Sequence, residues 1–333
     1  MHFSGPIIPP MTRITAVTAF LFAAAFPSGV FAAAPQEISR DYIQGAMNTL
    51  VSVRERFTDT GKGLVRPYLV KELERAGLSV SLHEDSGNIN IIGEKKGSLH
   101  ARRAQEERIL VVGAHYDSVE GSSGADDDAS GVAAALGVAY ALGGMSHPHT
   151  LRITLYDNEE KGLWGSKAYV GHLCAAGELD KLAGALIMDV IGYDKNADNA
   201  FQIFNCMYDP ASPYNGSDLL SARLLETIAA AKLPLRHLPS CIDGGSDHIP
   251  YWYAGQRAVL ITQNLTGGDG VPEDYNNCIN QTCDNIEHVS TSYITLIANA
   301  VALGANDLLD RPPPKLEPVF EAPGFMGYIE RWL

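Results

Sequence analysis

The chain has 333 residues, of which 46% are hydrophobic and 19% charged, and its formal net charge at pH 7 is −14. This apolar share is ample for a large core and argues against a disordered chain. Net acidity without a cluster of Lys and Arg argues against a nucleic-acid partner, because phosphate binding needs concentrated positive charge.

The N-terminal segment has the pattern of a secretory signal peptide. Arg13 precedes an apolar run over residues 14–26, and small residues follow near Ala32. The run is shorter than the ~20 apolar residues that span a bilayer, and its charge and length are typical of an export signal. We therefore expect residues 1–32 to be a signal peptide that is removed, leaving no stable membrane span, and the mature chain to be periplasmic or secreted.

Two amphipathic helices are predicted after this segment. Apolar residues recur at helical spacing over residues 36–57 and 64–76. Pro67 would fall in the first turn of the second helix, where a proline is tolerated. Residues 78–85 and 88–94 alternate between apolar and polar side chains on either side of a Ser-Gly pair, which predicts two antiparallel strands at a sheet edge.

The rest of the chain alternates between apolar strands and helices. Strands are predicted at residues 108–115, 150–160, 182–193 and 257–265, and helices at residues 129–144, 162–174, within 212–232, and at 290–309. This alternation predicts an α/β fold with a mostly parallel mixed β-sheet sandwiched between helices. We expect a single globular domain over residues 33–310, followed by a proline-rich tail over residues 311–333.

The five cysteines suit an exported protein, in which disulfides can form. Cys278 and Cys283 flank a short polar loop and predict a local disulfide. Cys206 with Cys241 is a second candidate pair, which would leave Cys174 over. None of the five has the paired spacing of a cysteine zinc site, so any metal must be held by carboxylates and imidazoles.

Charged side chains follow three of the predicted strands. The residues concerned are His115 and Asp117, then Asp157, Glu159 and Glu160, then Asp189, and a later glycine-rich loop adds Asp247 and His248. Because the carboxyl ends of parallel strands meet at one edge of a sheet, these side chains should converge. Carboxylates with only imidazoles nearby would be strongly destabilising without a cation. Asp, Glu and His suit zinc, and two ions would neutralise more charge than one.

Each of these pieces also has an ordinary explanation. "ADDDASG" alone is compatible with a solvated loop before a helix N-terminus, where acids are favourable. The triplet Ser246-Asp247-His248 suggests a hydrolase triad, but adjacent residues rarely face the same atom. Asp157 and Asp194 are expected to be ordinary polar groups. The joint occurrence of the pieces at successive strand ends favours the metal site.

The ordered motifs "AHYDS", "GADDDASG", "EEKGLWGS", "MDVIGYD" and "GSDH" resemble those of the secreted di-zinc aminopeptidase family. That family includes bacterial leucyl aminopeptidases, and its relatives include glutaminyl cyclases and the transferrin-receptor ectodomain. The resemblance extends from about residue 38 to residue 309 and implies a zinc aminopeptidase-like fold. One stretch departs from the pattern, because Cys283 stands in a region where relatives carry a His-containing sequence, and this affects the pocket and its specificity.

The resemblance assigns a role to each motif residue. It implies two Zn²⁺ ions, with Asp127 bridging them, and a cis peptide bond between Asp127 and Asp128. The other implied metal ligands are His115 and Asp189 on one ion, and Glu160 and His248 on the other. Glu159 would be the general base. Asp117 is expected to orient the His115 imidazole, and Asp247 either to support His248 or to cap its loop.

These assignments predict an exported di-zinc aminopeptidase that removes the N-terminal residue of peptides with a free amine. Glu159 would take a proton from a water shared by the two ions and pass it to the leaving amine. The alternatives are a single-zinc enzyme that cyclises N-terminal glutamine, a carboxypeptidase or dipeptidase of the same fold, and a non-catalytic binding module. The oligomeric state and the preferred N-terminal residue are not set by these patterns.

Overall fold

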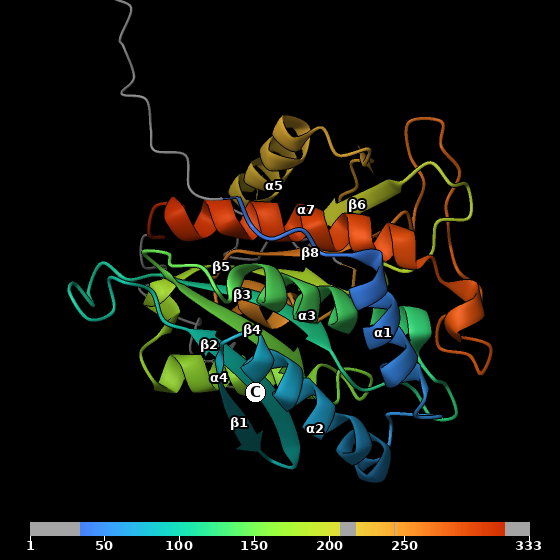
Figure 1. The fold of residues 1–333 in the computed structure, drawn as a ribbon, viewed down its shortest axis with the longest axis horizontal. Helices are drawn as coiled ribbons and strands as arrows, with labels where there is room; N and C mark the ends of the chain where they lie inside the picture. Colours follow the sequence, from blue (N-terminus) through green and yellow to red (C-terminus); the bar gives the residue numbers. More distant parts are fainter. Residues whose placement is uncertain (1–33, 207–217, 243, 317–333) are drawn as a thin grey trace, which may run out of the picture. The chain divides into compact units, whose positions relative to one another are not determined.

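The structure is a computed structural model that describes residues 34–206, 218–242 and 244–316 (Figure 1). The expected signal peptide, residues 1–32, lies outside the described residues, and so does the C-terminal tail beyond residue 316. The prediction of export therefore stays a prediction.

Within the described ranges, eight strands form one mixed sheet in the order β1-β2-β4-β3-β5-β8-β6-β7. The bounds are β1 Ser79–Asp85, β2 Asn88–Lys95, β3 Ile109–His115, β4 Thr150–Tyr156, β5 Leu182–Met188, β6 Ala200–Phe204, β7 Arg236–His237 and β8 Ala258–Gln263. β4, β3, β5 and β8 run parallel at the centre, while β2 and β6 flank them in antiparallel pairing. The predicted α/β fold with a mixed sheet is confirmed.

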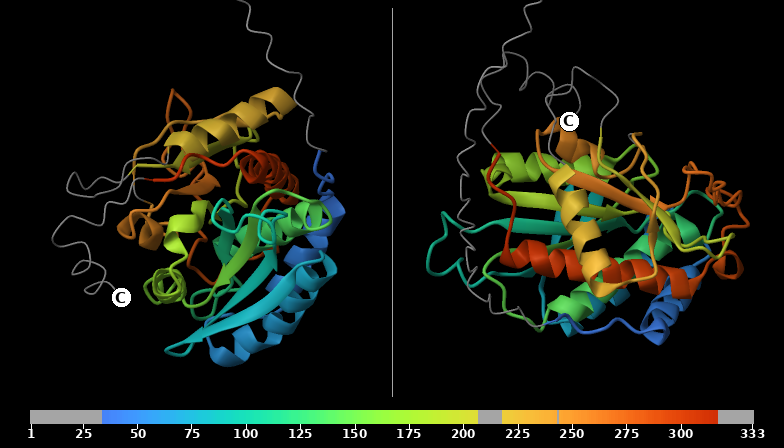
Figure 2. Two further views of the ribbon diagram at one scale, coloured as in Figure 1. Left: turned by 90° about the vertical axis from the view of Figure 1, so that its left-hand side faces the viewer. Right: turned by 90° about the horizontal axis from the view of Figure 1, so that it is seen from above.

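Helices cover both faces of the sheet (Figure 2). The larger group comprises α1 Arg40–Val51, α2 Asp59–Arg75, α3 Ser130–Leu142, α5 Asp218–Ala231 and α7 Thr291–Asp310, and the smaller group α4 Trp164–Ala175 and α6 Ile249–Tyr253. Successive residues of β3 point to opposite faces. Leu110 and Val112 therefore join the core under the larger group, and Ile109 and Val111 the core under the smaller one. All seven residues of β3 are buried.

α7 is long and apolar enough to cross a membrane by length and composition alone. Its apolar side is buried in the core with α3 and α5, which is the usual situation of a core helix in a globular domain.

Several predicted boundaries were wrong. α2 begins at Asp59, not residue 64, because the Thr58 side chain caps it by accepting a hydrogen bond from the Gly61 amide. Pro67 consequently lies inside the helix and not in its first turn. β4 ends at Tyr156, so the acidic residues after it form a turn, and the short strands β6 and β7 were not predicted.

Both candidate cysteine pairs form disulfides in the structure, with Cα–Cα distances of 5.5 Å for Cys206–Cys241 and 5.2 Å for Cys278–Cys283. Cys174 is a free thiol. The two disulfides agree with the expectation that disulfides can form in an exported chain.

Candidate metal centre

Three of the expected ligands meet where β3 and β5 end. His115 Nε2 lies 3.1 Å from Asp127 Oδ1 and 3.5 Å from Asp189 Oδ1. One candidate ligand atom of each residue lies within 4.8 Å of the other two. A metal ion with bonds of about 2 Å could therefore contact all three side chains.

The fold explains this convergence. His115 is the last residue of β3, and Asp189 follows directly after the neighbouring parallel strand β5. Asp127 belongs to η1 (Ala125–Ala129), a short segment before α3 in which Asp127 and Asp128 have non-helical backbone angles. The peptide bond between Asp127 and Asp128 is cis, as the resemblance implies.

The two adjacent glutamates reach the same place from β4. Glu159, Glu160, Asp127 and Asp189 all line one cavity of about 350 Å³. The turn that presents the glutamates contains Asn158 in a left-handed conformation, with φ of 53°. Glu160 thus lines the same cavity as Asp127 and Asp189, but it is not part of the group of three whose ligand atoms all lie within 4.8 Å of one another.

His248 approaches from the loop before α6. Its side chain is fully buried, and its ring packs edge-on against Trp252 with centroids 4.4 Å apart. The charge of His248 contributes to lowering the pKa of Asp189, although the His115 charge contributes more. The structure thus brings His115 next to Asp127 and Asp189, and Glu159 and Glu160 into the cavity that both aspartates line. His248 is linked to this group through its charge interaction with Asp189.

Burial and like charge dominate the electrostatics of this cavity. Burial raises the pKa of Glu159 well above its usual range, and it raises the pKa of Glu160 to about 8. Burial lowers the pKa of His115, but the charges of Asp189 and Glu159 outweigh this and raise it well above its ordinary value. The cavity therefore holds more carboxyl groups than its own imidazoles could neutralise if all of them were ionised.

Three buried atoms of the cluster make no well-formed hydrogen bond, namely His115 Nε2, Asp189 Oδ1 and Glu160 Oε1. A buried polar atom without a partner costs ~1–3 kcal/mol, and more when charged. These atoms are an imidazole nitrogen and carboxylate oxygens, which are the donors that zinc accepts. The residues therefore fit a bound cation.

Asp117 occupies the place expected for an orienting residue. Its Oδ1 lies 3.3 Å from His115 Nδ1 and also accepts the backbone N–H of Glu159 at 3.1 Å. Its Oδ2 accepts the N–H of Glu160 at 3.2 Å. One fully buried carboxylate thus contacts the histidine and both glutamates. Asp247 is also fully buried, and burial raises its pKa to about 7.

Two buried cations next to the site were not predicted. The Arg56 guanidinium donates to the carbonyls of Tyr116, Ser123 and Gly124, and so fixes the loop after β3. Lys62 Nζ donates to Asp157 Oδ1 at 2.7 Å and to Asn158 Oδ1 at 2.6 Å. Asp157 is therefore half of a buried ion pair that holds the turn before Glu159, and not an ordinary polar group.

Asp284 was also missed. Its two oxygens accept the backbone N–H groups of Asp126 and Asp127 at 2.9 and 3.1 Å. Asp126 in turn accepts hydrogen bonds from the Gly192 amide and from the side chains of Gln263 and Asn276. The loop carrying Asp127 is thereby fixed from the segments after β5 and β8 and from the disulfide loop that ends at Cys283.

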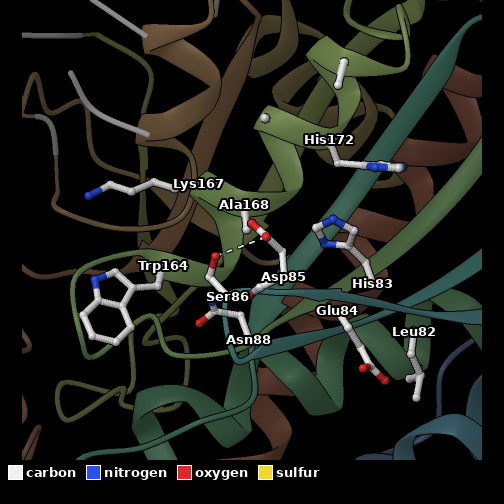
Figure 3. Close-up of a pocket in the computed structure, with 12 residues that line it drawn as sticks. Leu82, His83, Glu84, Asp85, Ser86, Asn88, Trp164, Lys167, Ala168 and His172 are labelled. Carbon is white, nitrogen blue, oxygen red and sulfur yellow. Dashed lines mark hydrogen bonds between the residues drawn. The ribbon is translucent and has the colours of Figure 1, made fainter. Parts of the chain in front are cut away.

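A different hollow of about 1050 Å³ lies between β1 and α4. Figure 3 shows His83 of β1 and His172 of α4 facing one another there, with ring centroids 4.7 Å apart. Trp164 and Lys167 complete its α4 side. None of the expected metal ligands lines this hollow, so it does not belong to the candidate metal centre.

The fold and the donor set together define a class of α/β proteins with metal-ligand side chains at the carboxyl ends of central parallel strands. Residues 90–304 match Peptidase family M28, and the chain belongs to this family. The resemblance inferred from the ordered motifs is thus confirmed.

Three similar proteins illustrate the relation. The chain is 29% identical over 265 residues to the probable leucine aminopeptidase 2 of Aspergillus oryzae, which covers 73% of this chain and 51% of that protein. The zinc aminopeptidase BSAP of Bacillus subtilis has a TM-score of 0.57 at 24% identity, covering 67% of this chain and 50% of BSAP. A glutaminyl cyclase of Bacteroides thetaiotaomicron has a TM-score of 0.65 at 16% identity, covering 82% of this chain and 99% of that one.

The low sequence identities and the partial coverage limit what these similarities show about the chain. At such identities the two structural similarities show the fold alone. The chain spans about half the length of the Aspergillus protein.

Removing the Asp284 carboxylate should loosen the Asp127 loop. Asp284→Ala leaves two buried N–H groups without an acceptor, so we expect the free energy of unfolding to fall by about 2–4 kcal/mol. Affinity for Zn²⁺ should fall ~10-fold, as for other residues that orient ligands. Glu287→Ala, an exposed acid three residues away, is the matched control. Equal zinc affinity in both variants would contradict this role.

Binding of Zn²⁺ should release protons at neutral pH. Because the pKa of Glu160 is about 8 without a cation, this carboxyl is mostly protonated at pH 7 and must lose its proton to become a ligand. The affinity for Zn²⁺ should therefore rise as the pH rises toward 8. Calorimetry at pH 7 in two buffers of different ionisation enthalpy should give release of about one proton or more per chain.

At pH 9 the proton release should be smaller, because Glu160 is then already ionised. If no proton were released at pH 7, Glu160 would not lose its proton when Zn²⁺ binds, and its role as a ligand would be contradicted.

Proposed function

We propose that this chain is an exported zinc aminopeptidase that hydrolyses the first peptide bond of substrates with a free α-amine. The observation that carries the proposal is the meeting of His115, Asp127 and Asp189 at a cavity that Glu159 and Glu160 also line. Membership of Peptidase family M28 supports peptide hydrolysis. The similar proteins described as leucine and zinc aminopeptidases support the choice of exopeptidase and metal.

We assign two zinc ions to the cavity. Asp127 would contact both, and the remaining ligands are His115 and Asp189 for one, with Glu160 and His248 for the other. The buried atoms without hydrogen bonds support this set, because a cation would satisfy them. Two ions rather than one are favoured by the number of buried carboxylates.

Bound zinc supplies a water of lowered pKa and polarises the peptide carbonyl. Glu159 would act as general base. Burial raises the pKa of its carboxyl, which suits a group that accepts a proton from the attacking water and returns it to the leaving amine. The Asp117 carboxylate contacts both the His115 ring and the Glu159 backbone, and so fixes the position of one relative to the other.

The charge of the cavity supports recognition of an amine and not of a carboxylate. Four of its lining residues are acidic, and none of the described residues that line it is Lys or Arg. A protonated α-amine complements such a surface. A carboxypeptidase would need a cation for the substrate's terminal carboxylate, so that alternative is disfavoured.

Export and domain organisation belong to the same proposal. The signal-peptide pattern over residues 1–32 and the two disulfides support secretion or a periplasmic location. The catalytic domain would extend over residues 33–310, with residues 311–333 as a tail.

Cyclisation of N-terminal glutamine is the second candidate, because the glutaminyl cyclase similarity covers 99% of that enzyme's chain. The retention of every expected ligand side chain favours hydrolysis, and it also ranks a non-catalytic binding module last.

Glu159→Gln should abolish turnover without loss of metal. The amide is isosteric but cannot accept the proton, so kcat should fall ~10²–10⁴-fold. Zinc content per chain should stay as in the unaltered protein. Glu120→Gln, an exposed glutamate in the loop after β3, provides the control. Activity within a few-fold of the unaltered enzyme would remove Glu159 from the mechanism.

A substrate comparison tests the exopeptidase assignment. The protein should hydrolyse leucine p-nitroanilide, and the N-acetylated form should be cleaved at least ~100-fold more slowly, because it lacks the amine. Chelation should abolish the activity and added Zn²⁺ should restore it. Equal cleavage of both substrates would contradict an aminopeptidase, and ammonia release from N-terminal Gln peptides without cleavage would favour the cyclase.

A further inference from the structure

A second group of carboxylates lies apart from the zinc cavity. Asp194, Asp198 and Asp274 each place one oxygen within 4.8 Å of the other two. Asp194 and Asp198 belong to the segment between β5 and β6, and Asp274 to the segment after β8. The group contains no imidazole or thiolate, so its chemistry differs from that of the zinc donors.

The buried side chain of Asp274 is only partly hydrogen-bonded. Only 1% of this residue is exposed, and its Oδ1 accepts the backbone N–H of Asn196 at 3.0 Å. Its Oδ2 is buried and makes no well-formed hydrogen bond. The nearby Asn264 side chain weakly favours the ionised carboxyl, but donates its own hydrogen bond to the Pro272 carbonyl at 2.7 Å. The buried Asp274 side chain thus carries an oxygen without a hydrogen-bond partner, and one of its oxygens lies within 4.8 Å of an oxygen of each of the other two carboxylates.

Protein cations do not neutralise this group. Burial raises the pKa of Asp194 and of Asp274, and repulsion by Asp198 adds to both rises. Arg236 Nη1 lies 3.9 Å from Asp198 Oδ2, but half of the Arg236 side chain is exposed. Such an exposed ion pair contributes little.

The local sequence has the spacing of a calcium loop. Residues 194–199 read Asp-Lys-Asn-Ala-Asp-Asn, which places oxygen-bearing side chains at the first, third and fifth positions. Asn199, the sixth, has φ of 54°, where calcium loops of this spacing usually carry glycine. Strands and not helices flank the segment, and the twelfth position is Asn205, so Asp274 would take the place of the distant glutamate.

We propose that Asp194, Asp198 and Asp274 form a Ca²⁺ site, with Asn196 as a further oxygen donor. An all-oxygen donor set suits Ca²⁺, whereas Mg²⁺ demands a small regular octahedron and Zn²⁺ prefers nitrogen or sulfur. This site does not depend on the proposed peptidase function.

The position of the site gives it a structural consequence. Asp194 lies five residues after Asp189, in the same segment. Between them, the Tyr193 amide donates to Gln263 Oε1 at 2.7 Å, and Gln263 Nε2 donates to Asp126 Oδ2 at 3.1 Å. A cation that joins the segments after β5 and β8 would therefore hold the backbone that presents Asp189 and Asp127.

The test uses the full mature protein loaded with Zn²⁺ and freed of Ca²⁺, with Zn²⁺ kept in excess. Calorimetric titration with CaCl₂ should give one Ca²⁺ per chain. At 1 mM Ca²⁺ the melting temperature should rise by about 5 °C if the dissociation constant is ~10 μM. Equal MgCl₂ should give a much smaller rise. No rise with Ca²⁺, or an equal rise with both salts, would overturn the site.

Asp274→Asn should lose about half or more of the Ca²⁺-dependent rise, because its affinity for Ca²⁺ should be at least ~10-fold weaker. Asp269→Asn makes the same charge change at an exposed position five residues earlier and should keep the rise. If Asp274→Asn does not fold, Asp198→Asn replaces it. A full rise in the folded variant, or its loss in Asp269→Asn, would contradict the assignment. Zinc content and p-nitroanilide hydrolysis, measured on the same samples, report separately on the proposed function.

Discussion

The mutual repulsion of buried carboxylates at the ends of β3, β4 and β5 is the constraint on which the rest of the structure depends. Asp127, Glu159, Glu160 and Asp189 line one small cavity, and burial raises the pKa of three of these four groups. Burial also acts to raise the pKa of Asp189, but the opposing contributions, of which the charge of His115 is the largest, outweigh it, so that the pKa of Asp189 is lowered. Bound protons or a metal cation can offset this repulsion, and the imidazole and carboxylate donors suit zinc.

A second layer of hydrogen bonds keeps these groups in place. Asp117 joins the histidine to the glutamates, Asp284 holds the backbone of the Asp127 loop, and Lys62 fixes the turn before Glu159. Most of these contacts join segments far apart in the chain. Ligand geometry is therefore set by the whole fold, and the proposed calcium site would extend the same principle to the segments after β5 and β8.

The sequence was most informative where structure is local. The continuous apolar runs of β3, β5 and β8 identified the buried centre of the sheet, and the donors directly after β3, β4 and β5 followed from that. The start of α2 was missed because its first turn is polar, although Gly61 and Lys62 are buried there. Arg56, Lys62 and Asp284 could not be found, because isolated residues carry no motif and their partners lie 60 to 158 residues away. β6 escaped because five residues are too short for a periodic signal.

The most direct test of the central claim is a crystal structure of the zinc-loaded protein with anomalous diffraction measured on both sides of the zinc absorption edge. The account predicts two zinc peaks about 3.5–4 Å apart, with Asp127 between them and His115 and Asp189 on one side. Absence of zinc from this cavity, with the carboxylates unchanged in position, would contradict the claim that a cation offsets their repulsion.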